Sequence, residues 1–206
     1  MDASGVIGVL LAAGQSRRMG RNKLNLPFGP GLLGSCAFGT ALESKLSFVF
    51  TVTNGIRTDE WLSPFLKNIR WKKVSITEGA TGQSESLKAG LREAEKSGAE
   101  AIMILLADQP FISTAMLNQL LAAYKQVGQE WIVSAADNGI CKPPVIFSKK
   151  FFSRLATLEG DQGARNILRH HEKVLRVELP AIAFRDIDTW KDYLIFKKEG
   201  GDEDSR

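Results

Sequence analysis

Basic side chains are concentrated in one short loop near the N-terminus. An apolar run, Val6–Ala13, ends at Gly14, and a turn of small and polar residues follows it. Four cationic residues lie within seven positions of this turn: Arg17, Arg18, Arg21 and Lys23. Small residues let a backbone approach a ligand closely, and N–H, guanidinium and ammonium groups together bind anionic oxygens. The loop therefore predicts a polyphosphate site, and with it a protein that handles a nucleoside triphosphate.

A carboxylate follows the most hydrophobic segment of the chain. Asp108 comes directly after the apolar run Ala101–Ala107 and precedes Gln109-Pro110. Mg²⁺ binds one or two carboxylates together with substrate phosphates, so Asp108 is a candidate metal ligand. The alternative is that Asp108 only caps the next helix or turn. Ser113 is a better helix cap, which leaves Asp108 available for other work.

A second pair of acidic residues lies near the C-terminus. Asp186 and Asp188 flank Ile187, and a strand expected near Phe184–Ile187 would place both carboxylates on one face. One of them could supply a second metal ligand, because a triphosphate bound to a single divalent ion is still strongly anionic. The alternative is that Asp188 or Thr189 caps the terminal helix.

Two glycine-rich segments could bind anions or polar groups. The first, Gly79–Leu91, enters a helix at Ser84, where free N–H groups favour an anion and the hydroxyls of Ser84 and Ser86 could contact a ribose or base. The second has the sequence GDQGAR, Gly160–Arg165, and could contact the second substrate. For both segments the alternative is an ordinary helix start, with Ser84 as the cap of the first.

Several common catalytic patterns are missing. No GxGxxG or GxxxxGK[ST] motif follows the first apolar run, so neither a dinucleotide site nor a P-loop is supported. No Ser/His/Asp or Cys/His set is visible. His170 and His171 are adjacent on an expected helix and point about 100° apart, so they cannot share a metal. Cys36 and Cys141 lie far apart in the chain and are expected to be reduced thiols.

Apolar runs alternate with amphipathic segments over the first two thirds of the chain. Strands are expected at Val6–Ala13, Phe48–Thr53, Lys73–Thr77, Ala101–Ala107 and Trp131–Ala135. Helices are expected at Leu32–Lys45, Asp59–Asn68, Ser84–Ser97 and Thr114–Val127. This alternation predicts an α/β fold, a single three-layer α/β/α domain with a mostly parallel sheet. In such sheets the ligand binds outside the carboxyl ends of the strands, where the cationic loop and Asp108 would lie.

The pattern changes after Ala136. Ile140–Phe147 contains Pro143-Pro144 and is expected to be an extended edge segment, because proline cannot donate to a β-ladder. The remaining expected elements are short helices near Lys149–Leu158 and Gln162–His171, a strand near Val174–Glu178 and a last helix at Trp190–Lys198. We expect one domain over residues 1–198 and a disordered tail over residues 199–206.

Composition sets wider limits. The 206 residues are 44% hydrophobic and 24% charged, with a formal net charge of +4, as expected of a globular chain. No run approaches the roughly 18 apolar residues of a membrane span. A mild positive charge suits anionic small molecules as well as nucleic acid. We expect a cytoplasmic protein that binds a small anionic substrate and neither a membrane nor nucleic acid.

Taken in order, the motifs resemble a known family. LLAAGQSRRMGRNKLNLP resembles the signature loop of nucleotidyltransferases with the glycosyltransferase-A-like, Rossmann-like fold. GQSESLKAGL, LLADQPFI, PPVIF, and GDQGAR followed by DIDT are similar to one branch, the molybdenum cofactor cytidylyltransferases of the xanthine dehydrogenase accessory type. The similarity runs from about residue 5 to residue 193.

The resemblance implies a role for each matched position. The base and ribose would be lined by Leu11, Ala12, Ala13 and Gly14, with Ser84 and Ser86 near the nucleotide. The triphosphate would be held by Arg18 and Lys23, which with Asp108 form the catalytic set. Mg²⁺ would be bound by Asp108 and Asp188. The pterin side would be formed by Gly160, Asp161, Gly163 and Arg165.

The resemblance also implies the reaction. CMP would pass from CTP to the terminal phosphate of molybdopterin with release of pyrophosphate, for maturation of a xanthine dehydrogenase-type apoenzyme that the protein could contact transiently. A phosphomonoester has a second pKa of about 6, so it is mostly dianionic at pH 7 and needs no general base. The methyl group of Ala13, where the guanylyltransferase branch has glycine, favours CTP over GTP.

Two alternatives remain open at this stage. The first is another nucleotidyltransferase of the same fold, which transfers GMP to molybdopterin or uses a sugar-phosphate or alcohol-phosphate acceptor. The second is a nucleotide-sensing or nucleic-acid-binding module without catalysis. One segment also departs from the family pattern. Gly34 and Gly39 lie inside the first expected helix, where each costs about 1 kcal/mol relative to alanine, so a short or broken helix is expected there.

Overall fold

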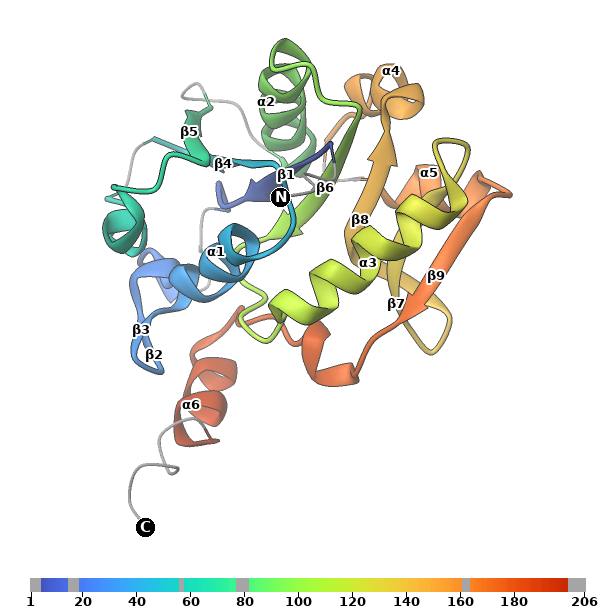
Figure 1. Cartoon of the computed structure of the whole chain (residues 1–206). Coiled ribbons are helices and arrows are strands. Elements are labelled where there is room, and N and C mark those ends of the chain that lie inside the picture. Colours follow the sequence, from blue (N-terminus) through green and yellow to red (C-terminus); the bar gives the residue numbers. More distant parts are fainter. Residues whose placement is uncertain (1–4, 15–18, 56–57, 77–81, 161–163, 200–206) are drawn as a thin grey trace.

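The computed structural model of the chain describes residues 5–14, 19–55, 58–76, 82–160 and 164–199. A seven-stranded sheet lies at its centre, with the strand order β5-β4-β1-β6-β8-β7-β9 (Figure 1). Its strands are β1 (Val6–Leu11), β4 (Phe48–Thr53), β5 (Trp71–Ser75), β6 (Ala101–Leu106), β7 (Ile132–Asp137), β8 (Ile140–Ser148) and β9 (Val174–Glu178). A separate two-stranded ribbon consists of β2 (Pro27–Phe28) and β3 (Gly31–Leu32).

The large sheet is mostly parallel, as the sequence predicts. Neighbouring strands from β5 to β6 pair in parallel, and so do β7 and β9. Only β8 is antiparallel to its two neighbours, β6 and β7. The four strands that carry the first motifs therefore end at the same edge of the sheet.

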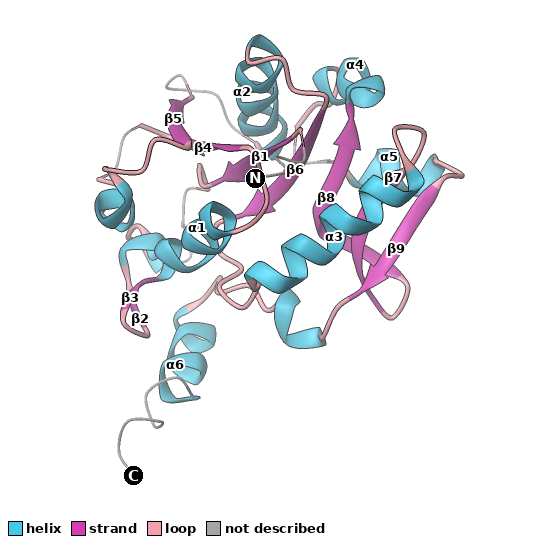
Figure 2. Cartoon of the chain, in the orientation of Figure 1, coloured by secondary structure: helices cyan, strands magenta, loops and turns pink. Residues whose placement is uncertain are grey.

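Helices cover both faces of the sheet and complete a three-layer domain (Figure 2). One apolar cluster contains residues of α1 (Leu33–Glu43) and α3 (Thr114–Val127), and the other contains residues of α2 (Gln83–Lys96), α4 (Phe152–Ala156) and α5 (Arg165–His170). Side chains alternate along a strand, so Leu10 of β1 joins the first cluster and Val9 joins the second. The fold class is therefore the expected one.

The central strands bring two distant motifs to one place. All six residues of β1 are buried, and β1 pairs with β6 in a register that sets Leu11 beside Leu106. The pairing continues one step further, because Ala107 N–H donates to the Leu11 carbonyl over 3.1 Å. The segments that follow β1 and β6 consequently leave the sheet side by side.

β8 lies inside the sheet, so the expectation of an edge segment over Ile140–Phe147 is wrong. The reason is a bulge. Ser134 pairs with Val145 and the next residue of β7, Ala135, pairs with Lys142, so the two prolines fall in the skipped part of the ladder. Proline is tolerated within a sheet at such a bulge because no ladder hydrogen bond is required of it there.

The first helix is continuous, which corrects the expectation of a short or broken one. α1 runs through both glycines from Leu33 to Glu43. A Cβ atom on Gly34 would lie 2.6 Å from Cδ2 of the buried Trp61 ring, so this position needs glycine for close packing. Gly39 faces Phe65, and a Cβ atom there would lie 3.4 Å from the ring. These glycines therefore permit contacts and do not break the helix.

Other segments differ in helix type. The expected helix Asp59–Asn68 is a 3₁₀ helix over Glu60–Phe65 that contains Pro64. Lys149–Phe151 is also a 3₁₀ helix and leads into α4. The strand expected near Phe184–Ile187 is not formed; a 3₁₀ helix over Ala181–Phe184 precedes irregular chain there.

The last helix, α6 (Trp190–Glu199), packs next to the cationic loop. Ile187 and Tyr193 share a small apolar cluster with Met19, Leu26 and Leu33. The Tyr193 hydroxyl donates to the Pro27 carbonyl over 2.8 Å. Among the described helices none combines the length and apolar character needed to cross a membrane. Glu199, expected in the tail, is instead the last residue of α6, and residues 200–206 of the expected tail lie outside the described residues.

Candidate active site

Lys23 occupies the centre of the candidate site. It begins a 3₁₀ helix, Lys23–Asn25, whose first turn is fixed by the Asn22 side chain accepting from Leu24 N–H. Only 8% of Lys23 is exposed. Its Nζ lies 2.7 Å from Asp108 Oδ2 and 2.6 Å from Asp188 Oδ1. Three residues identified from separate motifs are thus joined by two ion pairs.

Asp108 is positioned by the end of β6 and does not cap a helix. The Ser113 side chain caps α3 by accepting from Met116 N–H over 3.3 Å, as the sequence predicts. The Asp108 carbonyl accepts from Ile187 N–H over 3.2 Å. This backbone bond holds the two acidic segments together and leaves the Asp108 carboxylate for Lys23.

The cap of α6 is Thr189 and not Asp188. The Thr189 hydroxyl accepts from Asp192 N–H over 3.2 Å, while the Asp192 carboxylate accepts from Thr189 N–H over 2.9 Å. This reciprocal arrangement is a capping box. The buried Ile187 anchors the irregular segment, so its acidic neighbours stay at the surface of the site without a strand.

Negative charge accumulates around Lys23. Burial raises the pKa of Asp186 to about 6, and the negative charges of Asp108 and Asp188 add to the rise. Burial lowers the pKa of Lys23, but the charges and hydrogen bonds of Asp108 and then Asp188 outweigh it and leave that pKa above its ordinary value. One ammonium group therefore faces a set of carboxylates that can accept further positive charge.

This set of donors fits a divalent cation whose remaining ligands come from a substrate. Within the described residues no three His, Cys, Asp or Glu side chains form a group that could hold a metal alone. Mg²⁺, however, needs only one or two carboxylates when substrate phosphates and water supply the other oxygens. Asp108 and Asp188 converge on one point, the Lys23 ammonium, and can supply the two carboxylates.

The residues expected at the nucleotide are in part described. Leu11 ends β1, and the Ala12 N–H donates to the Val52 carbonyl over 2.8 Å, so the chain leaves the sheet in extended form. Ala13 is buried, with 9% exposure, and Gly14 is exposed. Arg18 and its neighbour Arg17 lie outside the described residues. Arg21 is described, with its guanidinium 5.1 Å from the centre of the Trp190 ring.

Ser84 and Ser86 lie in the first turn of α2 and are buried. The residue at the N-cap is Gly82, so the alternative in which Ser84 caps the helix is wrong. The Ser84 N–H donates to the Gly160 carbonyl over 3.3 Å, which brings the two glycine-rich segments together. Among the pterin-side residues Gly160 and Arg165 are described, whereas Asp161 and Gly163 are not.

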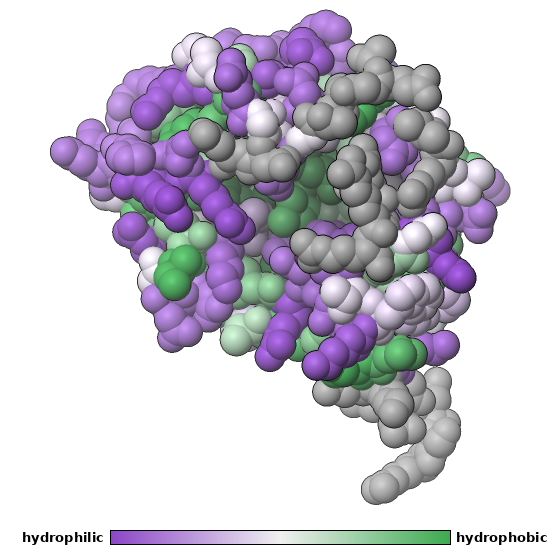
Figure 3. Space-filling model, turned by 180° about the vertical axis from the view of Figure 1, so that it is seen from behind, coloured by the Kyte–Doolittle hydropathy of each residue, from purple (hydrophilic) through white to green (hydrophobic). Residues whose placement is uncertain are grey.

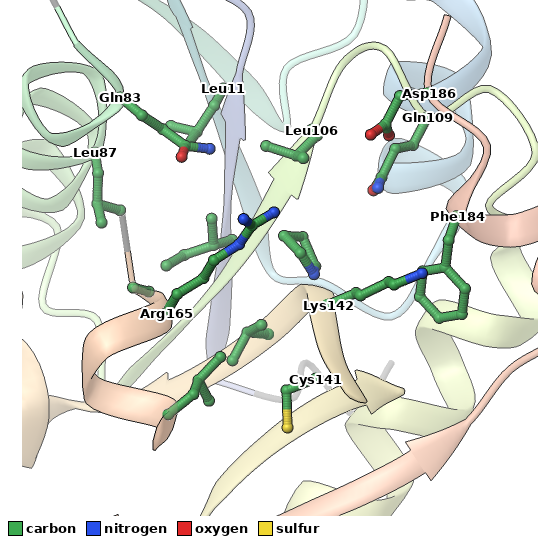
Figure 4. Close-up of a pocket in the computed structure, with 15 residues that line it drawn as sticks. Leu11, Gln83, Leu87, Leu106, Gln109, Cys141, Lys142, Arg165, Phe184 and Asp186 are labelled. Carbon is green, nitrogen blue, oxygen red and sulfur yellow. The ribbon is translucent and has the colours of Figure 1, made fainter. Parts of the chain in front are cut away.

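A cavity of about 160 Å³ joins several of these segments (Figure 4). Leu11, Arg165 and Asp186 line it, so it includes residues expected on the nucleotide side and on the pterin side. Seen from behind, the molecule has a hollow with apolar side chains at its base and hydrophilic ones around it (Figure 3). Among the described residues of the expected nucleotide set, Leu11 lines this cavity and the others do not.

Sequence reasoning missed four polar or aromatic residues of the cavity wall: Gln83, Gln109, Lys142 and Phe184. Gln109 is 3% exposed, and its Oε1 has no hydrogen-bond partner in the described part of the chain. Its place directly after Asp108 was a usable signal. No sequence signal pointed to Lys142 or Phe184, because only the bulge and the turn after β9 bring them to the cavity.

A comparison with protein-family models shows which family the chain belongs to. Residues 8–174 match the model of the MobA-like NTP transferase domain. The chain belongs to this family. It is 38% identical over 198 residues to the purine catabolism protein PucB of Bacillus subtilis (strain 168), which covers 91% of this chain and 94% of that protein. The resemblance seen in the motifs is thereby confirmed, and the chain is a nucleotidyltransferase of the MobA-like type.

Solved structures of MobA-like and related proteins share the fold. A homologue of Mycobacterium tuberculosis Rv0371c from Mycobacterium sp. strain JC1 has a TM-score of 0.78 and 29% identity, covering 96% of this chain and 97% of that one. Rv0371c itself, in complex with manganese, has a TM-score of 0.73 and 22% identity over 94% and 98%. Molybdopterin-guanine dinucleotide biosynthesis protein A of Archaeoglobus fulgidus has a TM-score of 0.68 and 15% identity over 94% and 98%.

Proposed function

We propose that this nucleotidyltransferase transfers CMP from CTP to the terminal phosphate of molybdopterin, releases pyrophosphate and serves the maturation of xanthine dehydrogenase-type enzymes. The observation that carries the proposal is the convergence of Asp108 and Asp188 on Lys23. The names of two similar proteins, one in purine catabolism and one in molybdopterin-guanine dinucleotide biosynthesis, support the substrate class. We assign the activity to one domain over residues 1–198.

The reaction requires the protein to bring two anions together. The acceptor phosphate has a second pKa of about 6, so it attacks the α-phosphorus as a dianion and no residue has to remove a proton. In this proposal Lys23 faces the departing pyrophosphate, where its fixed positive charge would stabilise the transition state. Alignment of the attacking and leaving oxygens supplies the rest of the acceleration.

Mg²⁺ is the proposed metal, with Asp108 and Asp188 as its ligands. When bound, it would neutralise phosphate charge and favour the leaving pyrophosphate. The manganese complex of Rv0371c supports the use of a divalent ion in this fold. Lys23 contacts both carboxylates, so phosphates bound to a metal held by these carboxylates would also lie near its ammonium.

The proposed choice of CTP depends on Ala13. Its methyl group is buried at the end of the first strand segment, where a glycine would leave more space beside the base. A single methyl group in a pocket is worth about 1–3 kcal/mol of discrimination. This difference favours the smaller pyrimidine ring over a purine.

The test compares nucleotides and acceptors separately. A thermal-shift series with Mg²⁺ and each of ATP, CTP, GTP and UTP should show the largest stabilisation with CTP, since a ligand that binds only the folded state raises its stability. Pyrophosphate release should then require CTP and molybdopterin together. A larger shift with GTP than with CTP would instead support transfer of GMP. Pyrophosphate release with a sugar phosphate but not with molybdopterin would instead support a sugar phosphate as the acceptor.

A further inference from the structure

The bulge in β8 turns an extra residue toward the cavity. Ser134 and Ala135 are adjacent in β7 but pair with Val145 and Lys142, which are three positions apart. In a regular strand successive side chains point to opposite faces. Here the three consecutive residues 141–143 all line the cavity. A bulge re-aims side chains in this way, and such bulges are common beside active sites.

Lys142 is held in a defined position on this wall. Its Nζ lies 2.6 Å from Asp137 Oδ2 and 5.0 Å from the centre of the Phe184 ring. Figure 4 shows the side chain extending along the cavity toward Phe184. An ammonium group has three donors, and a single hydrogen bond, to Asp137, is found for Lys142 among the described residues. Donors therefore remain for a ligand.

The opposite wall carries a second cation above an apolar base. Arg165, the first residue of α5, extends its guanidinium into the cavity (Figure 4). In the described part of the chain no carboxylate lies within ion-pair distance of it. Leu106 and Val145 contribute apolar surface between the two cations. An apolar base with cations at two sides suits a flat conjugated ring system whose edge carries carbonyl oxygens.

We propose that Lys142 binds the ring system of the acceptor substrate, beyond the phosphate that reacts, and that it is a specificity-determining residue for the acceptor. This inference rests on the proposed function. The Phe184 ring and the Lys142 ammonium form one side of the binding surface, and an ammonium donor to a carbonyl oxygen sets the orientation of the ring. Asp137 is the positioning residue that holds the ammonium.

The test separates binding of the acceptor from binding of the nucleotide. Lys142→Met keeps the length of the side chain and removes its charge, Lys142→Arg keeps the charge, and Lys125→Met makes the same change at an exposed position of α3. Lys142→Met should raise the KM for molybdopterin about tenfold, the loss expected for one charged hydrogen bond, and leave kcat and the KM for CTP unchanged. Lys142→Arg should restore most of the affinity, and Lys125→Met should match the wild type. An unchanged KM for molybdopterin, or an equal rise in the KM for CTP, overturns the proposal.

A direct binding measurement distinguishes this inference from the proposed function. Quenching of pterin fluorescence reports molybdopterin binding without CTP, and thermal unfolding checks that each variant is folded. If the wild type binds molybdopterin but releases no pyrophosphate, the proposed function fails, and weaker binding by Lys142→Met alone still supports the inference. If the wild type neither binds nor transfers, both fail.

Discussion

Lys23 and Asp188 are 165 positions apart in the chain, and their charged groups lie 2.6 Å apart. The contact joins the loop after the first strand to the segment before the last helix. Two further links support it: the Tyr193 hydroxyl bonds to the Pro27 carbonyl, and Ile187 packs with Leu26. The site therefore depends on the C-terminal segment closing onto the N-terminal loop.

Replacing Lys23 by Met should abolish most of the turnover and also reduce stability. The variant leaves Asp108 and Asp188 facing each other without their shared cation. If Lys23 acts on the reacting phosphates as proposed, loss of its charge should lower kcat about 10²–10³-fold. The variant also loses two charged hydrogen bonds, of which one alone typically contributes about 1.5–3 kcal/mol, so the free energy of unfolding should fall by at least about that amount.

Pyrophosphate release and urea unfolding measure these two effects. Lys67→Met provides the control, because Lys67 is exposed and distant in the chain from the site. It should change neither quantity. Turnover in Lys23→Met within a few-fold of the wild type would remove Lys23 from the mechanism.

The carboxylate cluster should make stability depend on pH when no divalent cation is present. The pKa of Asp186 is about 6 in the folded protein, mainly because burial raises it, and about 3.9 in an unfolded chain. Between these values the folded state binds more protons, so the contribution of Asp186 to stability is complete below about pH 3.9 and is lost as the pH rises through about 6. Asp186→Asn cannot ionise and should avoid this loss.

Urea unfolding in EDTA from pH 4 to pH 8 provides the measurement. The variant and the wild type should be alike near pH 4, and the variant should become the more stable of the two above pH 6. Two parallel pH profiles would contradict it.

Local sequence patterns were sufficient to predict an element or a site residue where one property dominates a segment. Buried runs such as Ala101–Ala107 predicted their strands. Asp108 stood out because it directly follows such a run, and Lys23 because it belongs to a cluster of cations in the turn after another. The order of strands and the contact of Asp188 with Lys23 depend on pairing between distant segments, which no local pattern contains. Here the motifs matched to the family, and not the spacing of residues, indicated Asp188 as a residue of the site.

The errors arose where packing overrides a local rule. Two prolines predicted an edge strand, yet the bulge opposite Ala135 accommodates them inside the sheet. The same bulge brings Lys142 into the cavity, so the residue could not be found from its neighbours in the chain. Glycines predicted a broken helix, although Gly34 is present because the Trp61 ring occupies the space of a side chain.

The two glycines of α1 should therefore respond in opposite ways to alanine. A Cβ atom at position 34 would meet the Trp61 ring at 2.6 Å, and overpacking of this kind reduces stability by about 1–3 kcal/mol. At Gly39 the nearest atom, on the Phe65 ring, is 3.4 Å away, so the gain in helix propensity of about 1 kcal/mol should prevail. Urea midpoints of Gly34→Ala and Gly39→Ala measure the difference, and equal shifts would show that propensity alone acts in this helix.

Tyr193→Phe tests whether α6 holds the cationic loop in place. The substitution removes only the hydroxyl that donates to the Pro27 carbonyl over 2.8 Å, while the ring stays in its apolar cluster. Stability should fall by about 1 kcal/mol, the usual value of one such hydrogen bond. If α6 also positions Lys23 through this loop, kcat should fall several-fold at saturating CTP and acceptor. A loss of stability with an unchanged kcat would show that α6 stabilises the fold without positioning the site.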